Sequence, residues 1–322
     1  MKKRRDCDAE KGMSRGEFLR LAAATAGALA AGSLLGSAGL ALAADRPVLR
    51  RPIPSSGEML PVIGVGTAVV YEIETSDAKF PLLVDSIKTF LENGGSLIDT
   101  SPTYGRAEKN LGEIFRRTGL RKQAFLATKI STSGEQSGID QVTNAMRDMG
   151  TERFDLLQVH NIRDTATHLR TIRRLKDEGK VRYVGITTSF DNAYGEFERV
   201  MQREKLDFIQ IDYALDNRNA EERILPLARE RGMAVLINLP FGRGRLFSRA
   251  RGKPLPPFAA EIDCTSWAQF FLKFLLANPA VTAVIPGTDR PEFAIDNLNA
   301  ARGRIPDARM REQMIRYWDQ LS

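Results

Sequence analysis

Short apolar runs alternate with amphipathic stretches from about residue 60 to the end of the chain. The runs are rich in β-branched residues, and the stretches between them are about 12 to 18 residues long, a pattern typical of βα units around a parallel sheet. Eight runs occur, at residues 62–67, 96–100, 124–130, 156–160, 182–188, 208–214, 234–240 and 283–288. Eight such units predict an α/β fold, a (β/α)8 TIM barrel, over residues 45–322.

Helical segments between the runs support this alternation. Residues 77–93, 166–178 and 220–231 are each followed by a glycine, which favours the end of a helix. The segment at residues 266–278 carries aromatic residues at helical spacing, and we interpret it as a helix packed against the barrel rather than a ligand site. These residues are Trp267, Phe270, Phe271 and Phe274.

Two further segments are assigned to the two ends of the predicted barrel. Residues 51–53 and 59–61 flank a polar Ser-Ser-Gly-Glu sequence, which predicts a small β-hairpin that closes the barrel floor. Residues 241–264 form the longest irregular stretch, which several prolines stiffen. We expect this stretch to lie over the site at the opposite end.

Three successive apolar runs end in polar residues that can do chemistry. Asp99, Lys129 and His160 terminate these runs, and Tyr104 follows Asp99 on the next loop. The carboxyl ends of barrel strands share one face, which is where active sites lie. A buried carboxylate is costly unless a cation pairs with it, so Asp99 is expected to contact Lys129. Taken singly, the three residues also suit a turn acid, a solvated lysine and a core histidine.

In the order Asp99, Tyr104, Lys129 and His160, on successive βα units, this set resembles the catalytic tetrad of the aldo-keto reductase family. The resemblance extends over nearly the whole chain after residue 45. It implies that Tyr104 is the proton donor and that Lys129 lowers its pKa. It also implies that Asp99 keeps Lys129 charged and oriented, and that His160 steers the carbonyl oxygen. The reaction implied is reduction of a carbonyl compound by a nicotinamide cofactor, usually NADPH.

The resemblance places the nicotinamide end of the cofactor on four strand ends. Thr67 stands under the nicotinamide ribose, and Gln210 matches the glutamine that binds the carboxamide. Thr187 and Thr188 replace the usual Ser-Asn pair, with the loss of an amide at Thr188. Asn238 stands where the family commonly stacks a tyrosine on the ring, and it also suits a residue that caps a strand. The cofactor segment continues through Leu239, Pro240 and Gly242.

Residues 285–292 resemble the loop of the family that binds the adenine-side phosphate. Either Thr288 or Asp289 is expected to cap a helix whose first turn contains Pro291, so that backbone amides of this helix face the phosphate. Pro286, earlier in the same loop, is also expected to contact the cofactor. Gly287 replaces a lysine found in many members.

The choice between NADP(H) and NAD(H) depends on the same region. Arg290 suits the 2′-phosphate of NADP(H) as a planar guanidinium, and it equally suits a solvated surface residue. Asn297 matches an adenine contact. On this basis NADP(H) is favoured over NAD(H).

Other chemistries find no support in the sequence. The two histidines and two distant cysteines lack zinc-ligand spacing, so no metal site is predicted. No Gly-x-Ser-x-Gly nucleophile motif is present. Gly64-Val65-Gly66 and Gly242-Arg243-Gly244 each lack the third glycine of a Rossmann fingerprint.

Residues 1–44 are predicted to be an export signal. A basic beginning leads to an Ala/Leu/Gly run, and Ala41-Leu42-Ala43 suits signal peptidase. Residues 14–20 resemble the twin-arginine consensus, although Gly16 replaces its second arginine, so the twin-arginine machinery is one candidate route. An uncleaved membrane anchor is the alternative. The many alanines and glycines favour cleavage, which predicts a periplasmic or otherwise exported protein, and Met13 is an alternative start.

Charge and cysteine content narrow the set of partners. Residues 1–44 carry seven Lys or Arg and four Asp or Glu, a net charge of +3, which leaves +4 of the formal +7 to the body. That small excess is spread along the chain without a basic block, which argues against nucleic-acid binding. Cys7 lies in the leader, so the exported body contains Cys264 alone and no intramolecular disulfide.

Two functions of different classes remain. The complete tetrad favours an exported NADP(H)-dependent oxidoreductase that acts on a small-molecule carbonyl or alcohol substrate, by reduction of an aldehyde or ketone. The departures at Asn238 and Thr188 motivate the alternative, a nicotinamide-binding or regulatory barrel protein with little or no turnover. Substrate specificity is assigned to the loops at residues 69–77, 131–138, 163–167 and 241–263, none of which has a diagnostic chemical group.

Overall fold

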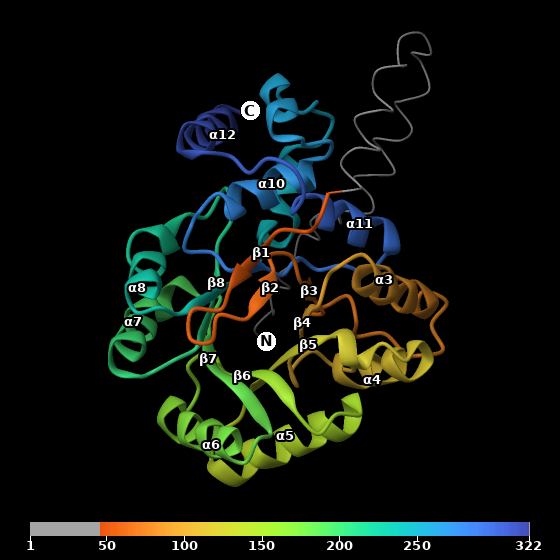
Figure 1. Cartoon of the computed structure of the whole chain (residues 1–322), viewed down its shortest axis with the longest axis vertical. Helices are drawn as coiled ribbons and strands as arrows, with labels where there is room; N and C mark the ends of the chain where they lie inside the picture. The colour runs from red at the N-terminus through yellow and green to blue at the C-terminus, as the bar shows by residue number, and fades with distance from the viewer. Residues whose placement is uncertain (1–45, 322) are drawn as a thin grey trace, which may run out of the picture.

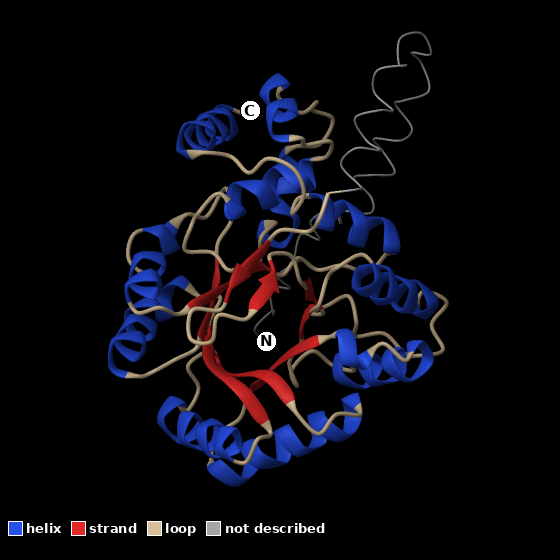
Figure 2. Ribbon diagram, viewed as in Figure 1, coloured by secondary structure: helices blue, strands red, loops and turns tan. Residues whose placement is uncertain are grey.

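The computed structural model describes residues 46–321, and its centre is a sheet of eight parallel strands. The sheet follows chain order, and parallel bridges from Ile63 to Val284 and from Gly66 to Gly287 join its first and last strands. The barrel is therefore closed, as the eight apolar runs predicted (Figures 1 and 2). The strands are β3 (Val65–Gly66), β4 (Leu97–Asp99), β5 (Phe125–Ile130), β6 (Phe154–His160), β7 (Val181–Thr187), β8 (Phe208–Asp212), β9 (Ala234–Asn238) and β10 (Ala283–Val284).

The strands β3 and β10 are shorter than the runs at residues 62–67 and 283–288 predicted. They meet at the seam of the barrel, where a side chain at Gly66 would place its Cβ 2.8 Å from the carbonyl oxygen of Ile285. Pro286 has no N–H to donate to a neighbouring strand. Close backbone approach and a missing donor therefore interrupt the regular ladder here.

Helices surround the barrel on its outer side (Figure 2). Those that follow strands are α3 (Phe80–Glu92), α4 (Ala107–Thr118), α5 (Glu135–Met149), α6 (Thr165–Asp177), α7 (Tyr194–Arg203), α8 (Ile224–Glu230) and α11 (Pro291–Asn299). The helix expected at residues 220–231 is a separate turn, η3 (Asn219–Glu221), followed by α8. Pro226 explains the later start, because proline is tolerated only in the first turn of a helix.

The aromatic segment forms α10 (Trp267–Leu276), and all ten of its residues are buried. Trp267 stacks on Phe271 with ring centroids 5.5 Å apart, and Trp318 of α12 (Ala308–Gln320) packs edge-on against Phe271 at 5.3 Å. Lys273 is also fully buried, and its ammonium donates to the carbonyls of Arg302 and Arg304 at 2.8 Å each. The interpretation of the aromatic residues as packing against the barrel is confirmed.

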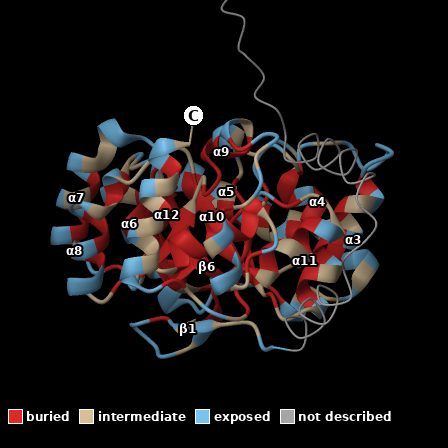
Figure 3. Ribbon diagram, turned by 90° about the horizontal axis from the view of Figure 1, so that it is seen from above, coloured by how far each residue is buried: buried red, intermediate tan, exposed pale blue. Residues whose placement is uncertain are grey.

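The hairpin at the barrel floor is also confirmed. The strands β1 (Arg50–Pro52) and β2 (Met59–Pro61) pair antiparallel and lie across one end of the barrel (Figure 1). Ile53 and Leu60 are buried in a separate apolar cluster with residues from the amino ends of the barrel strands. Seen from the side, β1 lies at one end of the molecule and α9 (Arg245–Arg249) at the other (Figure 3).

The stretch at residues 241–264 is less irregular than expected. It contains η4 (Gly242–Gly244), α9 and η5 (Pro257–Ile262). Residues 1–44, predicted to be an export signal, lie outside the described residues, so cleavage, route and location stay predictions. Between residues 46 and 321, no helix has both the length and the apolar character needed to span a bilayer.

Candidate active site

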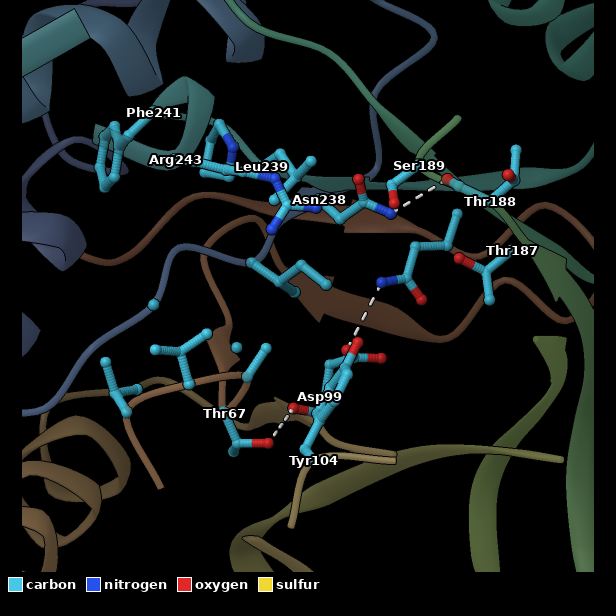
Figure 4. A pocket seen from close by; sticks show the side chains of 18 of the residues that line it. Thr67, Asp99, Tyr104, Thr187, Thr188, Ser189, Asn238, Leu239, Phe241 and Arg243 are labelled. Carbon is cyan, nitrogen blue, oxygen red and sulfur yellow. Dashed lines mark hydrogen bonds between the residues drawn. The ribbon is translucent and has the colours of Figure 1, made fainter. Parts of the chain in front are cut away.

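A cavity of about 570 Å³ opens at the carboxyl ends of the barrel strands. Its lining includes three of the four predicted tetrad residues, Asp99, Tyr104 and His160, while Lys129 lies behind them. In Figure 4, Asp99 and Tyr104 occupy one side, and Asn238, Leu239 and Arg243 occupy the opposite side. The cavity therefore lies where a barrel is expected to hold its active site.

Asp99 and Lys129 form a buried ion pair, as the sequence predicted. The Nζ of Lys129 lies 2.8 Å and 2.7 Å from the two carboxylate oxygens of Asp99, and 2.6 Å from the carbonyl oxygen of Thr100. Both side chains are at most 3% exposed. Burial is the largest single influence and lowers the pKa of Lys129, but the charge and hydrogen bond of Asp99, together with Tyr104 and Glu108, outweigh it, so this pKa lies above its ordinary value. The ammonium is thus held charged inside the protein.

Tyr104 lies on the loop after β4, with its ring 5.3 Å from the Nζ of Lys129. The lysine lowers the pKa of Tyr104, as expected, but burial raises it more, and the net pKa lies above the ordinary value. The predicted effect of Lys129 is therefore present, but burial outweighs it. The side chain is a protonated phenol at neutral pH, which is the form that can donate a proton.

His160 ends β6 and its ring lies edge-on to Tyr104, with the ring centroids 6.2 Å apart. Its Nδ1 lies 3.3 Å from the hydroxyl of Ser101 and 3.1 Å from that of Ser131. Burial, followed by the positive charges of Lys129 and Arg163, lowers the pKa of His160 to about 3. The imidazole is consequently neutral at physiological pH.

Two glutamine amides complete the surroundings of Asp99. The Nε2 of Gln210 lies 3.4 Å from one carboxylate oxygen, and the Nε2 of Gln158 lies 3.5 Å from the other. Gln158 also donates to the Oε1 of Gln210 at 2.8 Å. The sequence interpretation missed Gln158, although its position two residues before His160 places both side chains on the same face of β6.

The structure brings most of the predicted nicotinamide-side residues to the cavity. Thr187, Thr188 and Asn238 line one side, with the Nδ2 of Asn238 donating to the carbonyl of Thr188 at 3.2 Å. The Oδ1 of Asn238 is buried and has no hydrogen-bond partner among the described residues. Thr67, Gln210, Leu239 and Pro240 also belong to the lining. The hydroxyl of Thr188 accepts the N–H of Phe190 at 3.3 Å. An orphaned amide oxygen beside threonine hydroxyls suits a ligand that carries an amide.

Five predicted cofactor residues lie outside the lining: Gly242, Pro286, Thr288, Arg290 and Asn297. Asn297 donates to the hydroxyl of Thr288 at 2.9 Å, and that hydroxyl donates to the carbonyl of Pro286 at 3.0 Å. These three residues brace the loop whose Gly287 does reach the cavity.

The predicted cap of the following helix is wrong. The N-cap of α11 is Arg290 rather than Thr288 or Asp289, and no side chain caps the helix. Pro291 is in the first turn, as expected, and it forces the preceding residue into an extended conformation, φ −144°. The guanidinium of Arg290 lies 3.7 Å from the carboxylate of Glu292.

Loop residues that the sequence did not single out supply much of the remaining lining. Of the four loops assigned to specificity, those at residues 69–77 and 241–263 reach the cavity, and Asn161, Ser189 and Phe190 come from others. Four non-glycine lining residues have positive φ, namely Val69, Asn161, Leu239 and Arg243. Strained backbone of this kind gathers at functional sites. Within residues 46–321 no group of His, Cys, Asp or Glu side chains is arranged to hold a metal ion.

Comparison with known proteins agrees with the geometry. The aldo-keto reductase YhdN of Bacillus subtilis is 28% identical over 202 residues, which cover 57% of this chain and 59% of that relative. The aldo-keto reductase str7 of Strobilurus tenacellus is 26% identical over 73% of this chain and 80% of its own. The crystal structure of an aldo/keto reductase from Klebsiella pneumoniae with NADP and acetate has a similar fold, with a TM-score of 0.67 at 22% identity over 81% of this chain and 93% of its own. The family model for the aldo/keto reductases matches residues 62–314, and the chain belongs to that family.

Proposed function

We propose that this protein reduces an aldehyde or ketone to the alcohol with NADP(H), and that Tyr104 is the proton donor. One observation carries the proposal: a protonated phenol faces a cavity, with a buried ammonium 5.3 Å from its ring and a neutral imidazole edge-on to it. Family membership supports the same class of reaction.

The residues of the tetrad take separate roles in this proposal. Tyr104 donates its phenolic proton to the carbonyl oxygen, and Lys129 stabilises the phenolate that forms. Asp99 and the carbonyl of Thr100 hold the ammonium in place. With the hydroxyl of Ser101 or Ser131 donating to Nδ1 of His160, the proton would stand on Nε2 and orient the substrate oxygen.

The chain's residues fit a nicotinamide cofactor, which supplies the hydride when it is bound. Thr187, Thr188 and Asn238 would hold the amide and the ribose at the polar side of the cavity. Arg243 has no ion pair with another described residue and lines the same cavity, so its guanidinium would meet the phosphates. Arg290 lies at the start of α11, where a 2′-phosphate would distinguish NADP(H) from NAD(H).

Cofactor binding and turnover in the purified full chain test this proposal. NADPH and NADH are titrated separately by quenching of intrinsic fluorescence, and cofactor oxidation is then followed with a panel of aldehydes and ketones. We expect NADPH to bind at least about tenfold more tightly, a difference of about 1.4 kcal/mol, and to be oxidised by carbonyl compounds.

Two arginine variants separate the cofactor contacts. Arg290→Ala should weaken NADPH and leave NADH unchanged, because only NADPH has the 2′-phosphate. Arg243→Ala should weaken both cofactors alike, since both share the pyrophosphate. Tight binding without turnover of any carbonyl compound would instead support a nicotinamide-binding protein, and binding of neither cofactor would contradict both functions.

A further inference from the structure

Two of the three exposed large apolar side chains in the described part of the chain line the cavity. Among the described residues these side chains are Met59, Val69 and Phe190, which are 49%, 73% and 50% exposed. Met59 belongs to the floor hairpin, whereas Val69 and Phe190 both line the cavity beside Tyr104. Isolated exposed apolar residues need no explanation, but two at the mouth of one cavity point to an apolar ligand.

The two residues approach the cavity from opposite sides. Val69 follows β3 and Phe190 follows β7, which are the first and fifth of the eight strands in the closed barrel. Thr67, just before the Val69 turn, and Ser189, next to Phe190, lie on opposite sides of the cavity in Figure 4. The loops that carry Val69 and Phe190 therefore flank the cavity that Tyr104 also lines.

The backbone at Val69 adopts an unfavourable conformation although its side chain is mostly exposed. Val69 has φ +69°, and the N–H of Val70 donates to the carbonyl of Ala68 at 2.8 Å. Together these features define a γ-turn of the rare strained type, with a β-branched residue at its centre. Because the side chain of Val69 is mostly exposed, this strain places an isopropyl group at the cavity mouth without filling the core.

Contacts with the catalytic loop hold this turn in place. The carboxylate of Glu72 accepts the N–H of Val69 at 3.0 Å, and the side chain of Glu72 lies against Gly105, where a Cβ would be 3.3 Å from its Cγ. Asn110 of α4 donates to the carbonyls of Tyr71 and Ile73, at 2.7 Å each. The position of Val69 is thus fixed relative to the loop that carries Tyr104.

Little charge is left in the cavity to recognise an ionic substrate. The carboxylate of Asp99 is already paired with Lys129, and the imidazole of His160 is neutral. The remaining charged lining residue, Arg243, lies on the side of the cavity opposite Tyr104 (Figure 4). The surroundings of the proton donor therefore favour an uncharged substrate.

We propose that Val69 and Phe190 are specificity-determining residues, which hold the apolar chain of an aldehyde or ketone between them while its carbonyl group faces Tyr104. This inference rests on the proposed function and names its substrate class. Each methylene fully buried between the two side chains would strengthen binding about fourfold. Carbonyl compounds with an apolar chain are consequently preferred over short or polar ones.

A series of straight-chain aldehydes from propanal to decanal tests this preference. We expect kcat/KM of the full chain to rise by about two- to fourfold per methylene until the apolar contact is filled. Val69→Thr keeps the shape and branching of valine but replaces one methyl group with a hydroxyl, and Phe190→Ser removes the aromatic ring, so each should flatten the dependence on chain length. Met59→Ser, which removes an equally exposed apolar side chain from the floor, should leave it unchanged.

Binding of the matching 1-alkanols, measured by calorimetry with NADPH present, separates the two possible failures. Aldehyde reduction without any dependence on chain length would overturn the specificity proposal and leave the proposed function standing. A steep dependence that persists in Val69→Thr and Phe190→Ser would also overturn it. Absence of all turnover would defeat the proposed function, and the alkanol affinities of the same variants would still decide whether this pair binds an apolar chain.

Discussion

The two ends of this barrel are built from the same eight strands but differ in chemistry. The floor is an apolar cluster in which Ile53 and Leu60 of the hairpin pack on aromatic and aliphatic strand residues. The mouth holds a buried ion pair of Asp99 and Lys129, and buried side-chain atoms of Gln158 and Asn238 have no partner among the described residues. The floor cluster is therefore apolar, while the mouth holds paired charges and polar atoms that are open to a ligand.

Backbone conformation shows the same contrast. The floor hairpin turns at Gly57, with φ +76°, where glycine tolerates that angle without strain. At the mouth, comparable angles fall on Val69, Leu239 and Arg243, for which they are unfavourable. Residues held in backbone conformations that are unfavourable for their type are typical of functional sites. Residues whose type suits their backbone conformation are typical of segments that serve stability.

The largest effect on activity is expected from Tyr104→Phe at the mouth, and Tyr183→Phe at the floor is its matched control. Tyr104→Phe should lower kcat/KM by about 10²- to 10⁴-fold with little change in stability, because it removes the proton donor. Tyr183, buried at the floor, bonds Ser56 and Glu58 through its hydroxyl, so Tyr183→Phe should cost about 0.5–1.5 kcal/mol of stability and leave the rate unchanged. Steady-state kinetics and thermal unfolding of both variants check this, and equal loss of activity in the two would contradict it.

The ion pair at the mouth should show the next largest effect. Lys129→Met leaves the Asp99 carboxylate buried without a cation, which should cost about 3–5 kcal/mol in denaturant unfolding as well as activity. The double variant Asp99→Leu/Lys129→Met should regain most of the stability and none of the activity. Arg182 pairs with Glu58 and Asp155 at the floor but is 31% exposed, so Arg182→Met should cost less because water can solvate the carboxylates. If Arg182→Met lowers the unfolding free energy as much as Lys129→Met does, the ion pairs at the two ends do not differ in their contribution to stability.

Most of the fold could be predicted from the sequence because each buried strand is an apolar run of its own. The limits of the strands were harder to predict where non-local contacts decide them. The run at residues 283–288 has the composition of a strand, yet only Ala283–Val284 is regular, since Pro286 lacks a donor and Gly66 approaches Ile285 from the far end of the chain.

The site could be predicted in part for the same reason. Asp99, Lys129 and His160 stand at strand ends, and the barrel brings strand ends together. Gln158 follows the same geometry, but an uncharged amide within an apolar run gives no separate signal. The exposure of Val69 could not be predicted, because valine ordinarily avoids positive φ and the turn depends on contacts with Glu72. Nor could the net pKa of Tyr104 be predicted, since it depends on how deeply the ring is buried.

The last expected effect depends on pH and concerns Glu108, a carboxyl of α4. Its Oε1 accepts from the hydroxyl of Thr128 at 2.7 Å, and the side chain is buried without a cation bonded to it. Burial raises its pKa from 4.5 to about 7, the negative charge of Asp148 adds to the rise, and Thr128 and Lys129 oppose it. Asp155, at the floor, is held instead by Arg182 and by the backbone amide of Leu126, each at 2.8 Å.

Because the pKa of Glu108 is higher in the folded than in the unfolded chain, the protonated form stabilises the fold, and that stability is lost as the pH rises from about 4.5 to about 7. Glu108→Gln should therefore match the wild type near pH 4 and exceed its unfolding free energy by about 3 kcal/mol near pH 8. Thr128→Val removes a bond that favours the charged form, so it should steepen the loss between the two pH values. Denaturant unfolding at both pH values measures this. A constant difference between Glu108→Gln and the wild type would mean that Glu108 does not titrate in this range, and the contrast between the two ends would then rest on the ion pair and the strained loops alone.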